Sequence, residues 1–555
     1  MNFNQINDRK DLANYIGVKP SFLTYHLYHN PKIKRNQHYT EFEIPKKSGD
    51  TRIIAAPNKK LKIIQKKLAY QLNEYLISLG FYRNNKNIHA FIKENKANKR
   101  GIISNSKIHR NKKYVVNIDL LNFFESIHFG RVKGYFQSDD KFNLSKDIAT
   151  IIAQICTYKG SLPQGAPTSP IISNLIGSIL DSKILKLTKK YKLHFTRYAD
   201  DITFSTNDHK FLENIEVFNK ELSRIIESAG FKINTSKTRL QFRKSRQQVT
   251  GLVVNEKLNI PRDYYKKTRA MANNLYKNDE FEIDGKIASR NQLEGRFSFI
   301  NQLEWYNNKK IKNKKNSYRY LSGKEKEYQR FIFYNYFIKS ESLVLITEGK
   351  TDSLYIKAAL KKYWKKYPKF IIKNDDGKFS FKIIFLNKTK RLNYFFGINK
   401  DGADSLIYLY NHYKGINGAN NLAEYFKKFN CKYSNPIIML FDNEINDKDK
   451  PLKKMYNHVK FNKEELHNNL YVNLINNLYI ATTPLIGSRN HSEIEDLFPK
   501  ETLDEGIKGR PFTKDENYNR KKNCGKDEFS KYIYNNYNEI NFENFIPLLD
   551  ALYKI

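Results

Sequence analysis

The stretch RYADDITFS, residues 197–205, places two carboxylates side by side between short apolar segments. The pattern predicts two short strands joined by a tight turn, with Asp200 and Asp201 at the turn. Asp119 ends another predicted strand, KYVVNID, directly before LLNFF. If these strands are neighbours in one sheet, three carboxylates converge, and their repulsion destabilises the fold unless cations lie between them.

Such a set of carboxylates suits divalent metal chemistry. Mg²⁺ prefers oxygen ligands and typically binds one or two carboxylates together with substrate phosphates. Two Mg²⁺ ions about 3.5–4 Å apart activate an attacking 3′ oxygen and stabilise the departing pyrophosphate. The chemistry that this arrangement predicts is nucleotidyl transfer, whereas an isolated Asp-Asp pair in a turn is more often a solvated loop.

The charge of the chain favours a polyanionic partner. Among its 555 residues, 98 are Lys or Arg and 57 are Asp or Glu, a formal net charge of +41. This excess predicts nucleic acid binding through phosphates. The alternative source of the charge is a compositional bias toward Lys and Asn. The content of hydrophobic residues, 40%, is sufficient for packed cores.

The sequence lacks the signals of a membrane or secreted protein. No apolar run approaches the roughly 18 residues that a membrane span needs, and the N-terminal residues have no apolar signal core. We therefore expect a cytoplasmic protein with no membrane partner. Cys156, Cys431 and Cys524 are far apart and form no CxxC pair, which predicts reduced thiols rather than a disulfide framework or a zinc site.

The order of predicted elements divides the chain into four regions. Residues 1–50 have the pattern of polar helices, and residues 51–250 alternate strands and helices as an α+β domain does. Residues 251–335 are helical and basic. Residues 341–555 carry short apolar strands between helices, which predicts a second, α/β domain; its strands are SLVLITEG, KIIFLN, PIIMLFDNE and LYIATTPL.

The motifs of the first regions resemble those of reverse transcriptases, and among them the retron type. Tyr198–Asp201 is similar to the family's YADD box, and LPQGAPTSP, residues 162–170, is similar to its LPQG and SP block. NIDLLNFF resembles the box that carries the first metal-binding aspartate, here Asp119. The resemblance implies an α+β right-hand polymerase of fingers, palm and helical thumb, with Asp119, Asp200 and Asp201 as catalytic residues and ligands of two Mg²⁺ ions.

The same resemblance assigns residues around an incoming deoxynucleotide. Phe124, five residues after Asp119, falls at the family's steric gate, where a ring excludes a 2′-hydroxyl; the alternative is an aromatic core residue. Arg52 matches a fingers arginine that contacts the triphosphate, and Lys237 matches a lysine near the same site. Gly165 would let the backbone approach the template and nascent pair. The implied substrate-binding residues are Arg52, Phe124, Gln164, Gly165, Tyr198, Ala199 and Lys237.

Two further segments point to the retron subgroup. VTG, residues 249–251, matches a retron-specific triplet at the start of the thumb. NSKIH, residues 105–109, resembles the retron NAxxH box, with Ser106 where alanine is usual. The resemblance implies a protein that binds its own folded noncoding RNA, primes from the 2′-hydroxyl of a branching guanosine, and makes a short, RNA-linked single-stranded DNA (msDNA). The implied RNA-binding residues are Asn105, His109, Val249, Thr250 and Gly251.

The C-terminal region resembles the Toprim domain of topoisomerases, primases and overcoming-lysogenization-defect (OLD) type nucleases. One predicted strand ends at Glu348, and a second ends at Asp442 and Glu444, where the family has DxD. Glu495 and Lys526 are similar to a third acidic motif and a late lysine of OLD-type nucleases. The resemblance implies Mg²⁺ or Mn²⁺ bound by these four acidic residues, with Glu348 and Lys526 as catalytic residues.

Together these resemblances predict a retron reverse transcriptase fused to a Toprim nuclease effector in antiphage defence. Its expected partners are deoxynucleotides, the cognate noncoding RNA, the msDNA product and a nucleic acid target of the nuclease. The alternatives are another bacterial reverse transcriptase, such as an intron maturase, or an RNA-binding scaffold with an inactive Toprim domain. The sequence leaves open whether the nuclease target is DNA or RNA and whether the protein is a homo-oligomer.

Overall fold

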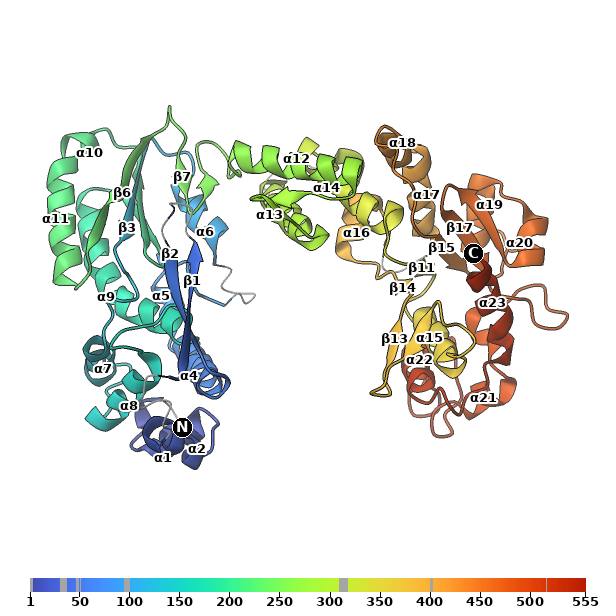
Figure 1. Cartoon of the computed structure of the whole chain (residues 1–555), viewed down its shortest axis with the longest axis horizontal. Helices are drawn as coiled ribbons and strands as arrows, with labels where there is room; N and C mark the ends of the chain where they lie inside the picture. The colour runs from blue at the N-terminus through green and yellow to red at the C-terminus, as the bar shows by residue number, and fades with distance from the viewer. Residues whose placement is uncertain are drawn as a thin grey trace. The chain divides into compact units, whose positions relative to one another are not determined.

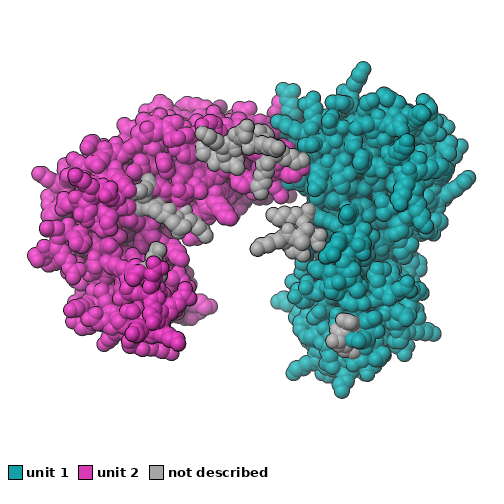
Figure 2. Space-filling view, turned by 180° about the vertical axis from the view of Figure 1, so that it is seen from behind, with its two compact units in different colours: residues 1–262 teal, residues 263–555 magenta. Residues whose placement is uncertain are grey.

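The fold in Figure 1 is that of a computed structural model, which describes residues 3–29, 37–45, 49, 51–93, 100–308, 318–399, 403–515 and 517–555. The chain divides into two compact units, residues 1–262 and 263–555, coloured teal and magenta in Figure 2. We describe each unit by itself. Within the segments just given, no helix combines the length and the apolar character needed to cross a membrane.

A four-stranded antiparallel sheet organises the first unit. Its strands are β3 (Tyr114–Leu120), β4 (His194–Tyr198), β5 (Asp201–Thr206) and β6 (Ile233–Phe242), in the order β4-β5-β3-β6. The predicted strand that ends near Asp119 and the predicted hairpin over residues 194–206 are both confirmed. Because β5 pairs with β3 as well as with β4, the turn of the hairpin lies beside the end of β3.

Two helices, α9 (Ser169–Lys190) and α11 (Ile215–Ser228), pack together on one side of this sheet (Figure 1). Helix α11 buries Phe218, Leu222 and Ile226, which recur every four residues and so lie on one helical face. The ring of Phe218 meets that of Phe204 on β5, with centroids 5.2 Å apart. Burying each such side chain stabilises the fold by about 1.5–3 kcal/mol.

The N-terminal region departs from the prediction of helices over residues 1–50. It begins with α1 (Arg9–Tyr15), α2 (Pro20–Thr24) and a π-helical turn at Tyr25–His29, but Tyr39–Pro45 is a strand, β1, paired antiparallel with β2 (Thr51–Pro57). Strand β1 is exposed at every residue after Tyr39, so it shows no buried face, and its pairing with β2 defines it instead. The other elements of this unit are α4 (Lys59–Ser78), α5 (Phe81–Asn84), α6 (Ile102–Ser106), α7 (Phe129–Ser138), α8 (Lys146–Cys156), α10 (Lys210–Glu213), β7 (Gln248–Val249) and β8 (Leu252–Val253).

The second unit starts with helices and continues with a mostly parallel sheet. Its sheet has the order β14-β11-β15-β17-β16 and consists of β11 (Val344–Thr347), β14 (Ile384–Phe385), β15 (Ile437–Phe441), β16 (Tyr471–Ile475) and β17 (Leu478–Thr482). Only β16 pairs antiparallel. The four predicted strands are confirmed, whereas β16 was not predicted. After β11 the chain forms β14 on one side of that strand and later β15 on its other side. At such a reversal of strand order, ligands bind beyond the carboxyl ends of the strands.

The helical part and the α/β part of the second unit share side-chain contacts. Arg391 of α16 forms an ion pair with Glu294 of α13 and donates hydrogen bonds to the hydroxyls of Tyr328 (3.0 Å) and Tyr336 (3.2 Å). The helices of the second unit are α12 (Arg262–Asn278), α13 (Arg290–Asn308), α14 (Gly323–Phe333), α15 (Asp352–Lys362), α16 (Lys390–Phe396), α17 (Ile407–Lys414), α18 (Leu422–Lys427), α19 (Pro451–Val459), α20 (Lys463–Asn469), α21 (Lys500–Glu505), α22 (Lys526–Asn535) and α23 (Ile546–Lys554); two ribbons pair β9 (Glu282–Ile283) with β10 (Lys286–Ile287) and β12 (Ile371–Lys373) with β13 (Phe379–Phe381).

A buried ion pair fixes the hairpin turn of the first unit. Arg197 of β4 donates two hydrogen bonds of 2.8 Å to Asp181 of α9, and both side chains are 0% exposed. Arg197 also donates to the carbonyl of Ala199 (3.2 Å), a residue held in the left-handed region with φ +57°. Helix α9 leaves room for this arrangement at Gly177, where a Cβ would lie 2.8 Å from the guanidinium.

We expect Arg197→Met to lower the free energy of unfolding of the first unit by about 3–5 kcal/mol, because Asp181 then stays buried without a partner. Urea denaturation of the full chain, followed by circular dichroism, measures the loss. The matched double variant Arg197→Met/Asp181→Leu removes both charges and should recover at least about half of it. Equal instability of the single and double variants would contradict this account.

Candidate active sites

The three aspartates predicted to converge lie at one edge of the first-unit sheet. Asp119 of β3 stands directly opposite Asp201 of β5 in the antiparallel register, and the amide of Leu120 donates to the carbonyl of Asp200 (3.0 Å). Directly opposite residues have Cβ atoms about 4.5–5.5 Å apart. The predicted convergence of the carboxylates is therefore confirmed.

The surroundings of these aspartates favour their protonated forms. Loss of solvent raises the pKa of Asp201 to about 7, and repulsion from Asp200 and Asp119 adds to the shift. Burial also raises the pKa of Asp200, again helped by Asp119, while Lys237 and Arg52 oppose it. A cation placed among these carboxylates would remove the repulsion, which is the electrostatic requirement of a metal site.

Asp119 has two polar partners on β6. Its Oδ2 accepts a hydrogen bond from Asn234 Nδ2 (3.0 Å) and lies 3.3 Å from Lys237 Nζ. Asn234 stands opposite Asp119 in the β3–β6 register. Lys237 was predicted from the sequence, whereas Asn234 was not. The position of Asn234 three residues before Lys237, in the same segment NTSKT, is the signal that could have identified it.

A cavity of about 470 Å³ opens over these residues, and we call it the aspartate cavity. Eight of its lining residues come from the sequence prediction in addition to Asp119: they are Arg52, Phe124, Gln164, Tyr198, Ala199, Asp200, Asp201 and Lys237. The structure thus brings together residues that lie up to 185 positions apart in the chain, since Arg52 and Lys237 line one space. Their individual roles stay predictions.

Gly165 lies beside the two-stranded ribbon formed by β1 and β2. It has φ +127°, and a Cβ at this position would lie 2.6 Å from the carbonyl oxygen of Ala55 on β2. The neighbouring Gln164 accepts a hydrogen bond from the Ala55 amide (2.8 Å). The structure thus shows a close approach of Gly165 to β2, the strand that carries Arg52; the expected approach to the template stays a prediction.

Phe124 forms part of the cavity wall and is half-buried. Its ring packs against Phe123 (centroids 5.5 Å apart) and Phe91 (6.2 Å). Contacts with these two rings restrict the movement of the Phe124 side chain, so its ring keeps a fixed place in the cavity wall. This placement suits the expected steric gate, although the ring also packs on the apolar core, as the alternative reading held.

The residues predicted to bind RNA are mostly interior. Asn105 and His109 are 0% exposed, and so is Val249. His109 lies between the hydroxyls of Thr196 and Ser205, at 2.7 Å from each, and burial lowers its pKa to about 3.

The two retron-like segments contact each other: Ser106 Oγ donates to the carbonyl of Val249 (2.9 Å), and Asn105 Nδ2 donates to Thr250 Oγ1 (3.4 Å). The side chains of Asn105, His109 and Val249 have no exposed surface in the structure; their role in RNA binding stays a prediction. Thr250 and Gly251 keep accessible surface and stay candidates.

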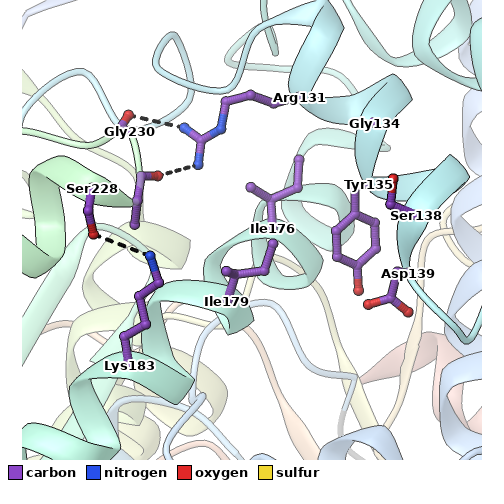
Figure 3. Close-up of a pocket in the computed structure, with 11 residues that line it drawn as sticks. Arg131, Gly134, Tyr135, Ser138, Asp139, Ile176, Ile179, Lys183, Ser228 and Gly230 are labelled. Carbon is purple, nitrogen blue, oxygen red and sulfur yellow. Dashed lines mark hydrogen bonds between the residues drawn. The ribbon is translucent and has the colours of Figure 1, made fainter.

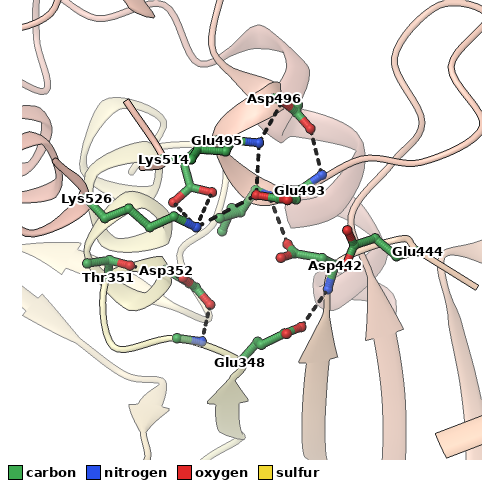
Figure 4. Close-up of polar contacts among 12 residues, drawn as sticks. Glu348, Thr351, Asp352, Asp442, Glu444, Glu493, Glu495, Asp496, Lys514 and Lys526 are labelled. Atoms are coloured by element: carbon green, nitrogen blue, oxygen red, sulfur yellow. Dashed lines mark hydrogen bonds and ion pairs between the residues drawn. The ribbon is translucent and has the colours of Figure 1, made fainter. Parts of the chain in front are cut away.

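A second group of carboxylates, the C-terminal acidic cluster, lies beyond the ends of β11 and β15 (Figure 4). Glu348 follows β11 and Asp442 follows β15, and these strands are parallel neighbours. The Asp442 amide donates to Glu348 Oε2 (3.3 Å), while the Ile494 amide donates to Asp442 Oδ1 (2.9 Å). The structure therefore brings Glu348 and Asp442 together at the place where the strand order reverses.

Burial and mutual repulsion raise the pKa values in this cluster. The pKa of Glu348 rises to about 7 through burial, with further repulsion from Asp352 and Glu444. Burial and the neighbouring Glu348 and Asp352 raise the pKa of Asp442 well above its ordinary value. As at the first-unit edge, a cation would relieve the repulsion.

Two lysines face the acidic cluster (Figure 4). Lys526 Nζ lies 3.2 Å from the fully buried Glu495 and 3.8 Å from Glu493. Although burial disfavours its charge, Glu495 and Glu493 raise the pKa of Lys526. Lys514 lies 2.9 Å from Glu493. Asp352, Glu493 and Lys514 were not predicted; Asp352, the first residue of the helix that follows the strand ending before Glu348, was the one that its place in a strand–turn–helix pattern could have identified.

Glu444, whose charge also acts on Glu348, is paired with a lysine. Its carboxylate lies 2.6 Å from Lys450 Nζ, and its side chain is 6% exposed. Of the two residues predicted for the DxD-like motif, Asp442 is thus the one in direct contact with Glu348.

Neither cluster encloses a metal ion with protein ligands alone. Within the described residues, no three His, Cys, Asp or Glu side chains are arranged to hold one. The carboxylate donors nevertheless fit Mg²⁺, which takes one or two carboxylates and completes its shell with phosphate and water oxygens. The residues present therefore fit ions that arrive with a nucleic acid or nucleotide substrate.

Another cavity of the first unit, about 560 Å³, lies among α7, α9 and the end of α11 (Figure 3). Its cations already have partners: Arg131 donates to the carbonyls of Ala229 (2.7 Å) and Gly230 (3.1 Å), and Lys183 donates to Ser228 Oγ (3.2 Å). The residues that line it include none of the predicted site residues. The first-unit site is accordingly the aspartate cavity.

Comparison with known proteins identifies relatives of the first unit. The model of a family described as reverse transcriptase (RNA-dependent DNA polymerase) matches residues 44–283. The retron Mx65 reverse transcriptase of Myxococcus xanthus is 30% identical over 313 residues, 53% of this chain and 68% of its own length. The retron Ec86 reverse transcriptase of Escherichia coli is 31% identical over 297 residues, 52% of this chain and 82% of its own length. For the retron Mx162 enzyme of Myxococcus xanthus, 30% identical, the chain spans 64% of its length.

Solved telomerase structures also match part of the chain. Apo telomerase from Candida tropicalis, truncated from its C-terminal domain, is 16% identical and aligns over 44% of this chain and 61% of its own, with a TM-score of 0.30. Telomerase from Candida albicans in complex with a fragment of telomeric RNA is 11% identical over 54% of this chain and 61% of its own, with a TM-score of 0.32.

The family match spans every residue placed around the aspartate cavity, whereas residues beyond 283 lie outside it. The Mx65 and Ec86 enzymes, 30% and 31% identical, are matched over more than two thirds of their own length. On this basis the chain belongs to the retron reverse transcriptases, which are RNA-dependent DNA polymerases.

Proposed function

We propose that this reverse transcriptase copies part of its own noncoding RNA into a branched, RNA-linked single-stranded DNA. The observation that carries the proposal is the facing pair Asp119 and Asp201, set in a cavity whose other walls supply Arg52 and Lys237. Nucleotidyl transfer requires carboxylates that bind metal ions and cations that bind a triphosphate, both in the same cavity. Membership in the retron family supports the branched product and the noncoding RNA as template.

Each side chain of the aspartate cavity has a definite task in this proposal. Asp119, Asp200 and Asp201 would hold Mg²⁺, which when bound activates the primer hydroxyl and neutralises the leaving pyrophosphate. Arg52 and Lys237 attract the incoming triphosphate, and Asn234 keeps Asp119 oriented through its hydrogen bond. The ring of Phe124 limits the space beside the sugar, so that a deoxyribose fits and a ribose does not.

Replacing both hairpin carboxylates by amides should abolish DNA synthesis. We expect Asp200→Asn/Asp201→Asn to lose at least about 1,000-fold in deoxynucleotide incorporation on the cognate RNA, because amides bind Mg²⁺ poorly. The assay is incorporation of labelled deoxynucleotides by purified full-length protein. The control is Asp140→Asn, an exposed carboxylate outside the cavity. Retained synthesis in the double variant would contradict the proposed site.

Metal binding at the aspartate cavity should strengthen as pH rises. Asp201, with a pKa of about 7, is mostly protonated near pH 6 and ionised near pH 8, and only the ionised form binds Mg²⁺. We expect the apparent dissociation constant for Mg²⁺ to fall about tenfold between pH 6 and pH 8. Calorimetric titration of the Glu348→Gln variant, in which the C-terminal cluster is weakened, isolates this site; Asp201→Asn should flatten the profile. A dissociation constant independent of pH would refute the assignment.

A specific observation also favours a second activity, and we propose that the C-terminal acidic cluster belongs to a Toprim-type nuclease that acts as a defence effector. Glu348 and Asp442 lie at the strand-order reversal with the cations Lys526 and Lys514 close by. In this role the carboxylates would hold Mg²⁺ or Mn²⁺, which supplies an activated water, and Lys526 would neutralise the scissile phosphate. The RNA–DNA product of the first unit would restrain the nuclease until infection disturbs it.

Glu348→Gln should remove nuclease activity and leave polymerase activity unchanged. We expect at least about a 100-fold loss in cleavage of single-stranded DNA and RNA with Mg²⁺ or Mn²⁺, because the amide no longer holds the ion. Gel assays of the full chain, freed of its nucleic acid at high salt, measure the cleavage. The control is Glu505→Gln, an exposed residue of α21. Absence of any cleavage by the wild-type protein would favour an inactive scaffold instead.

The defence proposal has its own discriminating outcome. If the polymerase product governs the effector, the Asp200→Asn/Asp201→Asn variant must change protection of cells against phage. A variant that makes no DNA yet protects cells as well as the wild type would separate defence from DNA synthesis while leaving both enzymatic assignments in place.

A further inference from the structure

The second unit contains an aromatic cavity of about 520 Å³, distinct from the acidic cluster. Trp305 of α13 and Tyr318 form the part of its wall contributed by the helical segment. Tyr394 of α16 and Tyr408 of α17 form the part contributed by the α/β segment. Its volume falls within the usual range for small-molecule sites, about 300–1,000 Å³. We call it the aromatic cavity.

The rings around the aromatic cavity form two neighbouring pairs. Trp305 and Tyr394 have centroids 5.2 Å apart, and Tyr318 and Tyr408 have centroids 5.8 Å apart. Gly397 permits the second pair, because a Cβ there would lie 2.9 Å from the Tyr318 ring and 3.1 Å from the Tyr408 ring. Trp305 nevertheless keeps 38% of its surface exposed. A large ring exposed beside other rings offers a stacking surface for a planar ligand.

Tyr318 provides a second, independent indication of a ligand. The residue is 7% exposed, and its hydroxyl is buried without a hydrogen-bond partner among the described residues. Buried polar groups in native proteins are nearly always hydrogen-bonded. A hydroxyl without a partner in the wall of a cavity marks a position for a polar atom of the ligand.

The charged and amide groups of the aromatic cavity are those that bind a phosphate and a base edge. Arg319 and Lys390 are exposed residues in its lining, as are the amides Asn393 and Asn399, and none of the described residues that line it is acidic. In sequence, five lysines stand between Asn308 and Tyr318. Basic residues therefore continue in sequence from this helical segment up to the residues of the cavity lining, a composition typical of proteins that follow a phosphate backbone.

We propose that the aromatic cavity binds an unpaired nucleotide, with its base stacked against Trp305 and its phosphate held by Arg319 and Lys390. The ligand chemistry is that of a base, a sugar and a phosphate, and the lysines that precede Tyr318 in the sequence favour a nucleotide within a single strand over a free one. Because its walls come from α13 on one side and from α16 and α17 on the other, an occupant contacts both the helical and the α/β parts of this unit. This proposal goes beyond the proposed function and requires catalysis at neither carboxylate site.

Trp305 itself reports the binding. The chain has two tryptophans, so Trp364→Phe leaves Trp305 as the sole one, and excitation that avoids tyrosine reads this cavity alone. The full-length Trp364→Phe protein, freed of nucleic acid at high salt, is titrated with oligodeoxynucleotides of about eight residues, with either adenine or thymine bases. Stacking should quench at least about a fifth of the Trp305 fluorescence in a saturable manner.

Matched variants in the Trp364→Phe background place the binding in the cavity. Lys390→Ala and Asn393→Ala, both at exposed positions, should weaken the apparent affinity at least about fivefold, which corresponds to about 1 kcal/mol. Tyr320→Ala is the control, because Tyr320 is 51% exposed, adjacent in sequence and outside the cavity lining. Its affinity should stay within about twofold of the parent.

A parallel titration with adenosine and thymidine monophosphates distinguishes a nucleotide within a strand from a free nucleotide. Strands that bind at least about tenfold more tightly than monophosphates support the proposal as stated. Equal affinity for both assigns the cavity to a free nucleotide and overturns the strand assignment. No quenching by either probe, or quenching that Lys390→Ala and Asn393→Ala leave unchanged, overturns the site itself. None of these outcomes bears on DNA synthesis, because no polymerisation takes place in the assay.

Discussion

The pairing of β3 with β5 is the constraint on which the first unit depends. In this register Asp119 faces Asp201, so hydrogen bonds between two backbones hold like charges close together. A slip of β5 by one residue against β3 would turn the Asp201 side chain to the opposite face of the sheet from Asp119. The register is maintained by the buried apolar residues of the same strands, among them Ile118 and Ile202, which are cross-strand partners with 2% and 0% exposure. Core packing thereby provides the free energy that keeps the carboxylates near one another.

Other contacts around this pairing stabilise the same geometry. The Arg197–Asp181 pair holds the turn that carries Ala199, and Asn234 and Lys237 bind Asp119 from β6. Carboxylates are also brought together in the second unit, where the parallel register of β11 and β15 places Glu348 and Asp442 at the same edge of the sheet. At both edges burial raises a carboxyl pKa to about 7, so the charge of both groups of carboxylates changes across the physiological pH range.

Local pattern was enough to predict much of this arrangement. The hairpin of residues 194–206 follows from alternating apolar residues around a two-residue turn, and the strands that end at Glu348 and Asp442 follow from short apolar runs. Asn234, Glu493 and Lys514 were missed because polar residues of these types are common on surfaces, and only long-range pairing gives them partners. Resemblance to a motif identified Asn105, His109 and Val249 but said nothing of their orientation, and the structure buries all three. The strand β1 was missed because it is exposed along nearly its whole length.

The helical and α/β segments of the second unit share one core, which limits how independently either segment could be exchanged. Tyr276 of α12 packs against Phe426 of α18 with centroids 4.9 Å apart, and Phe333 at the end of α14 packs against Tyr413 of α17 at 5.0 Å. A gene fragment that stopped at the end of the helical segment would leave these aromatic rings in water and the segment without half of its interior. The helical and α/β segments therefore cannot be exchanged independently: replacement of the α/β segment would have to preserve the faces of α16, α17 and α18 that the helical segment covers.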